Sequence, residues 1–83
     1  MKALYFAWLR ERVGLAEETI APPPEVSTVR DLVEWLVARG DNYANAFARA
    51  EFIRAALDKR HVKPDALIAG AREVAFFPPM TGG

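Results

Sequence analysis

The chain has 83 residues, enough for one small domain, and its 52% hydrophobic and 27% charged residues are typical of a globular fold. Eleven basic and eleven acidic residues cancel, so no basic excess is available to hold a phosphate backbone, and no nucleic acid partner is expected. The absence of cysteine excludes disulfides and thiolate metal sites, and the single histidine, His61, cannot form a metal cluster alone.

The N-terminal segment predicts two antiparallel strands. Lys2 to Leu9 is predicted as the first strand, and its residues from Leu4 to Leu9 are apolar on both faces, which is typical of a strand in the middle of a sheet. This run is too short to span a membrane and no cleavage site follows it, so we expect a cytoplasmic protein with no membrane partner. A turn over 10–16 pivots on Gly14, and Glu17 to Ala21 forms the second strand, which Pro22-Pro23-Pro24 ends.

The clearest helix is predicted over Thr28 to Arg39. Thr28 and Asp31 have the spacing of a capping box, and Gly40 is expected to end the helix in the left-handed conformation. The apolar residues recur every three or four positions, as a helix covering a sheet requires: Val29, Leu32, Val33, Leu36 and Val37. A shorter second helix is predicted within Asp41 to Ala50, with Asp41 or Asn42 as its cap.

The C-terminal half predicts the remaining strands. Phe52 to Leu57 is a third strand, Ala66 to Ile68 is a short edge strand or bridge, and Glu73 to Pro78 is the fifth. This order of elements suits an α+β fold, in which a mixed sheet of four to five strands carries one main helix and a short second helix.

The last ten residues combine a buried strand with an extended tail. Pro78-Pro79 ends pairing because proline has no N–H, so the chain leaves the sheet in an extended conformation. Gly82 and Gly83 lack side chains and form the thinnest peptide available. Such a tail can enter a narrow channel and present its carboxylate to another protein, although an ionised carboxylate must be activated before it reacts.

The sequence resembles a known family at both ends. The matching residues are the run from Glu73 to Gly83, Leu4-Tyr5-Phe6-Ala7, Arg10-Glu11, Val13-Gly14 and the helix entry Thr28-Val29 with Leu32. This pattern is similar to the small subunits of molybdopterin synthase, a sulfur-carrier family. The resemblance implies a ubiquitin-like β-grasp domain over 1–77, with the first and last strands parallel at its centre, and a tail over 78–83.

The resemblance also implies a function. A partner enzyme would use ATP to adenylate Gly83, and a sulfur donor would convert it to a thiocarboxylate. The large synthase subunit would then receive the tail, and sulfur would pass to a cyclic pterin precursor to make molybdopterin. Gly83 is the reacting residue, Thr81 and Gly82 thread the channel, and the partner-binding anchor comprises Phe76, Phe77, Pro78, Pro79 and Met80. The chain itself is expected to bind no cofactor or metal and to have no side-chain catalytic site.

Two alternative functions remain open from the sequence: a thiamine-pathway sulfur carrier, and a ubiquitin-like modifier whose Gly83 is joined to a lysine. A further expectation concerns the sheet. Successive side chains of a strand alternate between faces, so either Val74 and Phe76 or Ala75 and Phe77 must point away from the main helix. We therefore expect an exposed aromatic patch on the open face near the first and last strands, unless the short helix or a loop covers it.

Overall fold

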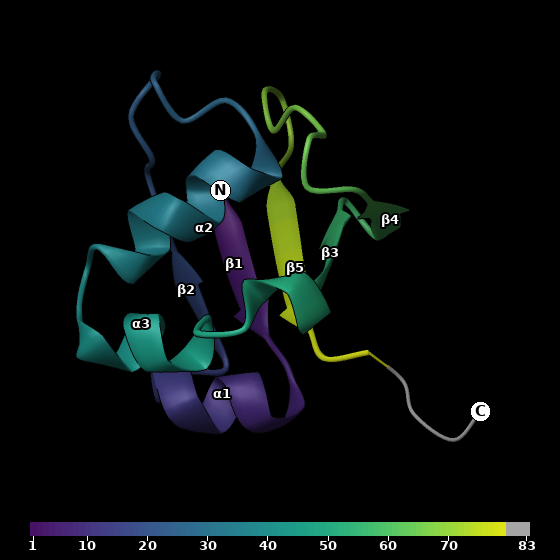
Figure 1. Cartoon of the computed structure of the whole chain (residues 1–83). Helices are drawn as coiled ribbons and strands as arrows, with labels where there is room; N and C mark the ends of the chain where they lie inside the picture. The colour runs from purple at the N-terminus through teal and green to yellow at the C-terminus, as the bar shows by residue number, and fades with distance from the viewer. Residues whose placement is uncertain (80–83) are drawn as a thin grey trace.

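A computed structural model describes residues 1–79, and Met80, Thr81, Gly82 and Gly83 lie outside the described residues. The chain forms five strands, three α-helices and one 3-10 turn (Figure 1). In chain order these are β1 (Lys2–Tyr5), α1 (Ala7–Val13), β2 (Glu17–Thr19), α2 (Val29–Val37), α3 (Asp41–Ala46), η1 (Ala50–Phe52), β3 (Arg54–Leu57), β4 (Arg60–Val62) and β5 (Glu73–Phe77).

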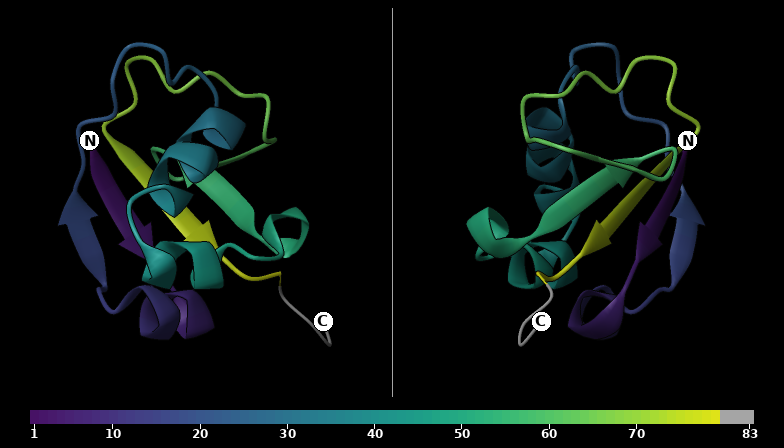
Figure 2. Two further views of the ribbon diagram at one scale, coloured as in Figure 1. Left: turned by 60° about the vertical axis from the view of Figure 1, so that its left-hand side comes forward. Right: turned by 90° about the vertical axis from the view of Figure 1, so that its right-hand side faces the viewer.

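The five strands form one mixed sheet in the order β2-β1-β5-β3-β4. Strands β1 and β5 are parallel neighbours at the centre, with Lys2 opposite Glu73 and Tyr5 opposite Phe76, and the other pairs are antiparallel. Helices α2 and α3 cover one face, while α1 lies across the end of the sheet (Figure 2). The predicted α+β fold, with its first and last strands side by side, is confirmed.

The core lies between the sheet and α2. Its largest fully buried side chains are Tyr5, Leu9, Leu32, Leu36, Val74 and Phe76. The Phe76 ring stacks on Tyr5 with centroids 6.2 Å apart and meets Phe47 edge-on at 5.1 Å. Aromatic pairs in these geometries add to the stabilisation from burial, so Phe76 joins the central strand to the residue that ends α3.

The first strand is shorter than predicted, because the chain leaves the sheet after Tyr5. The expectation of a strand to Leu9 was wrong: Ala7 adopts a left-handed φ of 54° and the chain turns directly into α1. In this helix Leu9 and Val13 are four residues apart, so they lie on the same side of the helix, and both are buried. The apolar residues at the start of α1 therefore fit a helix as well as the predicted strand. Gly14, the predicted pivot, ends α1 with φ 92°.

The predicted cap of α2 is present. The Thr28 side chain accepts a hydrogen bond from the Asp31 N–H at 3.1 Å, and the Asp31 carboxylate accepts one from the Thr28 N–H at 3.2 Å. These bonds satisfy N–H groups that have no partner within the helix. The backbone amides of Ser27 and Thr28 accordingly hold the pKa of Asp31 below its usual range.

The other end of α2 differs from the prediction. The helix ends at Val37, and Gly40 has φ 165°, which is extended backbone rather than the expected left-handed stop. Gly40 instead precedes α3, which begins without a side-chain cap. The Asn42 amide donates to the Val13 carbonyl at 2.8 Å, so this predicted cap residue links α3 to the end of α1 instead.

The C-terminal half follows the prediction in part, because β4 (Arg60–Val62) was not predicted and other boundaries are shifted. The third strand begins at Arg54, because Ala50–Phe52 forms the 3-10 turn, and β5 ends at Phe77 rather than Pro78. Asp58 and Lys59 both have positive φ, the conformation that closes a tight hairpin between β3 and β4. The bridge predicted within Ala66 to Ile68 is confirmed as a pairing of Leu67 with Thr28. Among residues 1–79, every helix falls short of the length and apolarity that a membrane span requires.

Candidate functional site: the open sheet face and the root of the tail

Strand β5 divides its side chains between the two faces of the sheet. Val74 and Phe76 have no exposed surface and lie in the core beneath the helices. Since neighbours alternate, Ala75 and Phe77 point to the opposite, open face. The structure thus selects between the two predicted arrangements, and the outward phenylalanine is Phe77.

The open face carries an apolar centre. Strand pairing places Leu4 and Ala56 on either side of Ala75, with Phe77 further along β5. Within residues 1–79, no helix lies over this face in either view of Figure 2. The aromatic part of the patch is smaller than predicted, because the chain turns into α1 before Trp8 and the centre is built of alanines.

His61 extends the open face towards the β4 edge. Its ring lies 5.1 Å from that of Phe77, centroid to centroid, and its side chain is exposed. The flat alanine surface and the flanking Leu4, Phe77 and His61 together form what we call the docking face. The two alanines at its centre have little exposed surface, so its accessible apolar area comes from the partly exposed Leu4 and Phe77. Partly exposed apolar side chains of this kind are common in protein interfaces.

The end of β5, from which the tail begins and which we call the root of the tail, is paired with the chain on both sides. The Phe76 carbonyl accepts a hydrogen bond from the Phe6 N–H at 3.1 Å, and Phe77 is paired with Arg54 of β3. Of the predicted anchor residues, Phe77, Pro78 and Pro79 are partly exposed, whereas Phe76 is fully buried. Phe76 therefore fixes the strand in the core and its side chain does not reach the surface. The predicted site residues Met80, Thr81, Gly82 and Gly83 lie outside the described residues.

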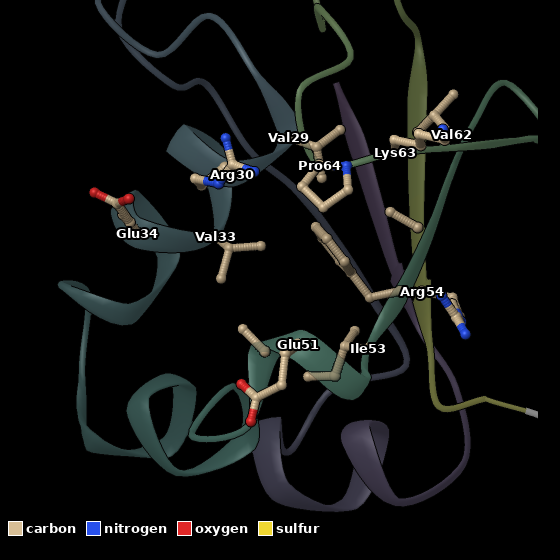
Figure 3. Close-up of a pocket in the computed structure, with 13 residues that line it drawn as sticks. Val29, Arg30, Val33, Glu34, Glu51, Ile53, Arg54, Val62, Lys63 and Pro64 are labelled. Carbon is tan, nitrogen blue, oxygen red and sulfur yellow. The ribbon is translucent and has the colours of Figure 1, made fainter.

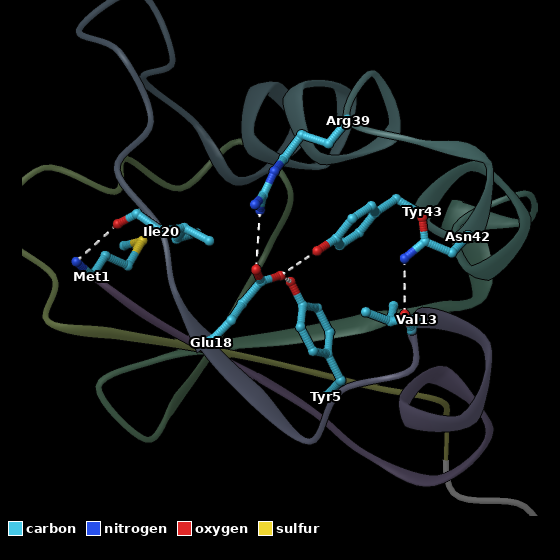
Figure 4. A network of polar contacts seen from close by, with 8 residues as sticks. All are labelled: Met1, Tyr5, Val13, Glu18, Ile20, Arg39, Asn42 and Tyr43. Atoms are coloured by element: carbon cyan, nitrogen blue, oxygen red, sulfur yellow. Dashed lines mark hydrogen bonds and ion pairs between the residues drawn. The ribbon is translucent and has the colours of Figure 1, made fainter.

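A polar cluster on the helix side of the sheet was missed at the level of sequence. The Glu18 carboxylate accepts hydrogen bonds of 2.7 Å from the hydroxyls of both Tyr5 and Tyr43, and it pairs with Arg39 at 3.3 Å (Figure 4). These partners come from β1, α3 and the segment after α2, so one carboxylate connects β2 to three other parts of the chain. Within residues 1–79, no group of three or more histidines and carboxylates lies close enough to hold a metal ion.

Opposing effects set the ionisation of this cluster. Burial favours the neutral Glu18 carboxyl, but hydrogen bonds from Tyr43 and Tyr5 and the charge of Arg39 outweigh burial and lower its pKa. Burial, and then the hydrogen bond to Glu18, raise the pKa of both Tyr5 and Tyr43. The cluster is thus an ionised carboxylate held by two neutral hydroxyls and a guanidinium, and it serves the packing of α3.

Replacing Glu18 with Gln is expected to reduce the pH dependence of stability in acid. The folded pKa of Glu18 is lowered, so its ionisation stabilises the fold above the unfolded pKa of about 4.3 and this contribution is lost as the pH falls further. Urea unfolding at several pH values from neutral to acidic measures the effect. Glu17→Gln, at an exposed neighbour that pairs with Lys2, is the control and should retain the wild-type profile. Identical profiles for Glu18→Gln and wild type would contradict this account.

Comparison with solved structures first defines the class, a ubiquitin-like β-grasp domain. A putative molybdopterin converting factor, subunit 1, from Pyrococcus furiosus matches with a TM-score of 0.74 and 30% identity, covering 95% of each chain. SAMP1 from Haloferax volcanii matches with a TM-score of 0.73 over 100% of this chain and 98% of its own, and its 23% identity supports the fold alone.

Sequence comparison then gives the family. The model of the ThiS family matches residues 3–83, and the chain belongs to this family. It is 38% identical over 84 residues to the molybdopterin synthase sulfur carrier subunit of Escherichia coli (strain K12), covering 100% of this chain and 99% of that protein. The subunit of the same name from Haemophilus influenzae is 29% identical, with the same coverage. The resemblance noted in the sequence is confirmed.

Proposed function

We propose that this chain is the sulfur carrier subunit of a molybdopterin synthase and that Gly83 carries the sulfur as a C-terminal thiocarboxylate. The observation that carries the proposal is full-length similarity to two proteins of that name, joined to a central strand that runs directly into the Pro-Pro-x-Thr-Gly-Gly ending. Fold alone supports no such assignment, because β-grasp domains serve many functions.

The chemistry begins with activation of an unreactive carboxylate. A Gly83 carboxylate oxygen attacks the α-phosphate of ATP in an adenylating partner enzyme, forming an acyl-adenylate and releasing pyrophosphate. A donor that supplies sulfur at the sulfide level attacks the acyl carbon and AMP leaves, which gives the thiocarboxylate. The thiocarboxylate sulfur then bonds to a carbon of a cyclic pterin precursor bound by the large subunit, and water cleaves the acyl–sulfur bond to return the Gly83 carboxylate. The partners supply the acid–base and phosphate-binding groups, and this ATP-dependent chemistry is assigned to the cytoplasm.

The docking face gives the carrier a surface for the large subunit. It adjoins the tail root at Phe77, so a partner seated there would receive Pro78 and Pro79 at its own surface and the following residues in its pocket. Thr81 and Gly82 thread that pocket in this proposal, with Met80 at its entrance. The buried Phe76 contributes by holding β5 in register against β1.

Replacing Phe77 with Asp is expected to weaken association with the large subunit by about 2 kcal/mol or more, the scale of an interface hot spot. The substitution removes the main aromatic side chain of the docking face and adds a charge that association would have to desolvate. Titration calorimetry with the large subunit measures the change, using variants with wild-type circular dichroism and melting.

Phe52 provides the matched control for this experiment. It is a phenylalanine with 51% of its surface exposed, in η1 on the helix side of the sheet. Phe52→Asp should leave the affinity near that of wild type. Unchanged affinity for folded Phe77→Asp, or equal losses for both variants, would move the interface away from the docking face.

Intact mass measurement of the protein from its native host tests the proposed function. Exchange of one oxygen for sulfur, located at Gly83 by fragmentation, is the expected result. A protein found only as a lysine conjugate would identify a modifier instead. A thiocarboxylate that supports thiazole formation but not molybdopterin formation in reconstituted reactions would identify a thiamine-pathway carrier.

A further inference from the structure

A cavity of about 450 Å³ lies between α2, η1 and the β3–β4 edge, on the helix side of the sheet (Figure 3). Its volume falls within the usual range for binding pockets of about 300–1,000 Å³. The apolar lining is contributed by Val29, Val33, Ile53, Ala55, Val62 and Phe76. The cavity therefore opens opposite the docking face, on a surface that the proposed sulfur chemistry does not use.

Charged residues of both signs line the cavity, namely Arg30, Arg54 and Lys63 together with Glu34 and Glu51. The Arg30 N–H donates to the Pro64 carbonyl at 2.9 Å, which brings Lys63 and Arg30 to the same end. Glu34 lies one turn further along α2, and Glu51 projects from η1 at the opposite end (Figure 3). Within residues 1–79 the ion pairs are Lys2–Glu17 and Arg39–Glu18, so these five charged side chains have no ion-pair partner there.

The interior favours apolar side chains over a polar small molecule. Among residues 1–79 no charged or polar residue is buried, and no buried side-chain nitrogen or oxygen lacks a partner. Small-molecule sites usually contain a few inward polar groups that orient the ligand, and none is available here. The N–H groups of Val29 and Arg30 already donate to the carbonyls of Ala66 and Pro64, so the start of α2 offers no anion site.

We propose that this cavity binds a short peptide segment of a partner protein through two apolar side chains, with an acidic residue beside Arg30 and Lys63 and a basic residue beside Glu34 and Glu51. Apolar insertion supplies affinity, and the charges of the rim set the direction of the peptide. Because the cavity and the docking face lie on opposite sides of the sheet, such a peptide can bind while the docking face is occupied. The proposal does not depend on the function assigned to Gly83.

Selection from a phage-displayed library of random dodecapeptides on the full-length protein tests the proposal. The expected result is enrichment of peptides with an acidic residue, two apolar residues and a basic residue in a fixed order. Binding of a synthetic enriched peptide should shift the amide NMR signals of Val33, Ile53 and Val62. Val33→Trp, which fills the cavity from the surface of α2, should lower the affinity for that peptide about ten-fold or more.

A charge exchange on α2 keeps the test independent of packing changes. The double variant Arg30→Glu with Glu34→Arg retains the net charge, and both side chains are exposed. It should also lower the affinity for the enriched peptide about ten-fold or more, whereas Phe77→Asp should leave that affinity unchanged. The proposal is overturned if no peptide is enriched, if the enriched peptides shift the signals of the docking face instead, or if the charge exchange leaves their affinity unchanged.

Discussion

Deletion of Gly83 is expected to abolish sulfur transfer while leaving the free energy of unfolding unchanged. The fold does not depend on this residue, because β5 ends at Phe77 and the described core is complete without it. Removing one residue withdraws the terminal carboxylate by about 3.3 Å, and reacting groups must lie within about 3–3.5 Å of each other in a productive geometry. The measurements are thiocarboxylate formation by intact mass, and molybdopterin formation with the purified large subunit.

The control for the deletion is Gly83→Ala, which keeps the carboxylate at the original chain length and adds one methyl group. It should retain more activity than the truncated chain, with the same melting temperature. A truncated protein that still forms a thiocarboxylate and supports molybdopterin synthesis would remove Gly83 from its assigned role.

Replacing Gly82 with Phe is expected to block activation or transfer almost completely. In the proposed function Gly82 lies in the narrow part of the channel, next to the reacting residue, so a bulky ring there would stop the tail before Gly83 reaches the reacting groups. Single-turnover product formation measures the effect, and binding of the large subunit, measured separately, should change much less because the docking face is intact.

A graded series at the same position sharpens this test. Gly82→Ala and Gly82→Val should give losses that increase with side-chain size, since a steric limit predicts that order. Phe52→Ala is the control for an unrelated change at an exposed position. Near-normal turnover for Gly82→Phe would show that there is no narrow channel.

Much of the fold could be predicted because strong local patterns agreed with the tertiary packing. This agreement holds for the apolar stripe of α2 and its Thr28–Asp31 cap. It holds also for the apolar central strands. Helix α1 could not be found in this way. Its residues continue the apolar run of β1, and the break between strand and helix depends on a left-handed φ at Ala7, an alanine that gives no turn signal.

The tail chemistry stays a prediction from the sequence, and the orientation of the strand that precedes the tail required coordinates. Alternation along β5 predicted that one phenylalanine faces outward, and the complete burial of Phe76 assigns this position to Phe77. The Glu18 cluster had a usable signal that was overlooked. Ile20 is buried, and Glu18, two residues earlier in the same segment, faces the same side. An acidic residue in the inward set of a strand requires hydrogen-bonding partners, here Tyr5 and Tyr43.

The position of β5 between β1 and β3 has a mechanical consequence. A partner that draws on the tail applies force along the axis of a strand paired on both sides, so the hydrogen bonds of both ladders are loaded together, in shear. An edge strand pulled outward would instead lose its bonds one after another. Because the tail follows a central strand, a partner can bind and release it repeatedly while the domain resists unfolding.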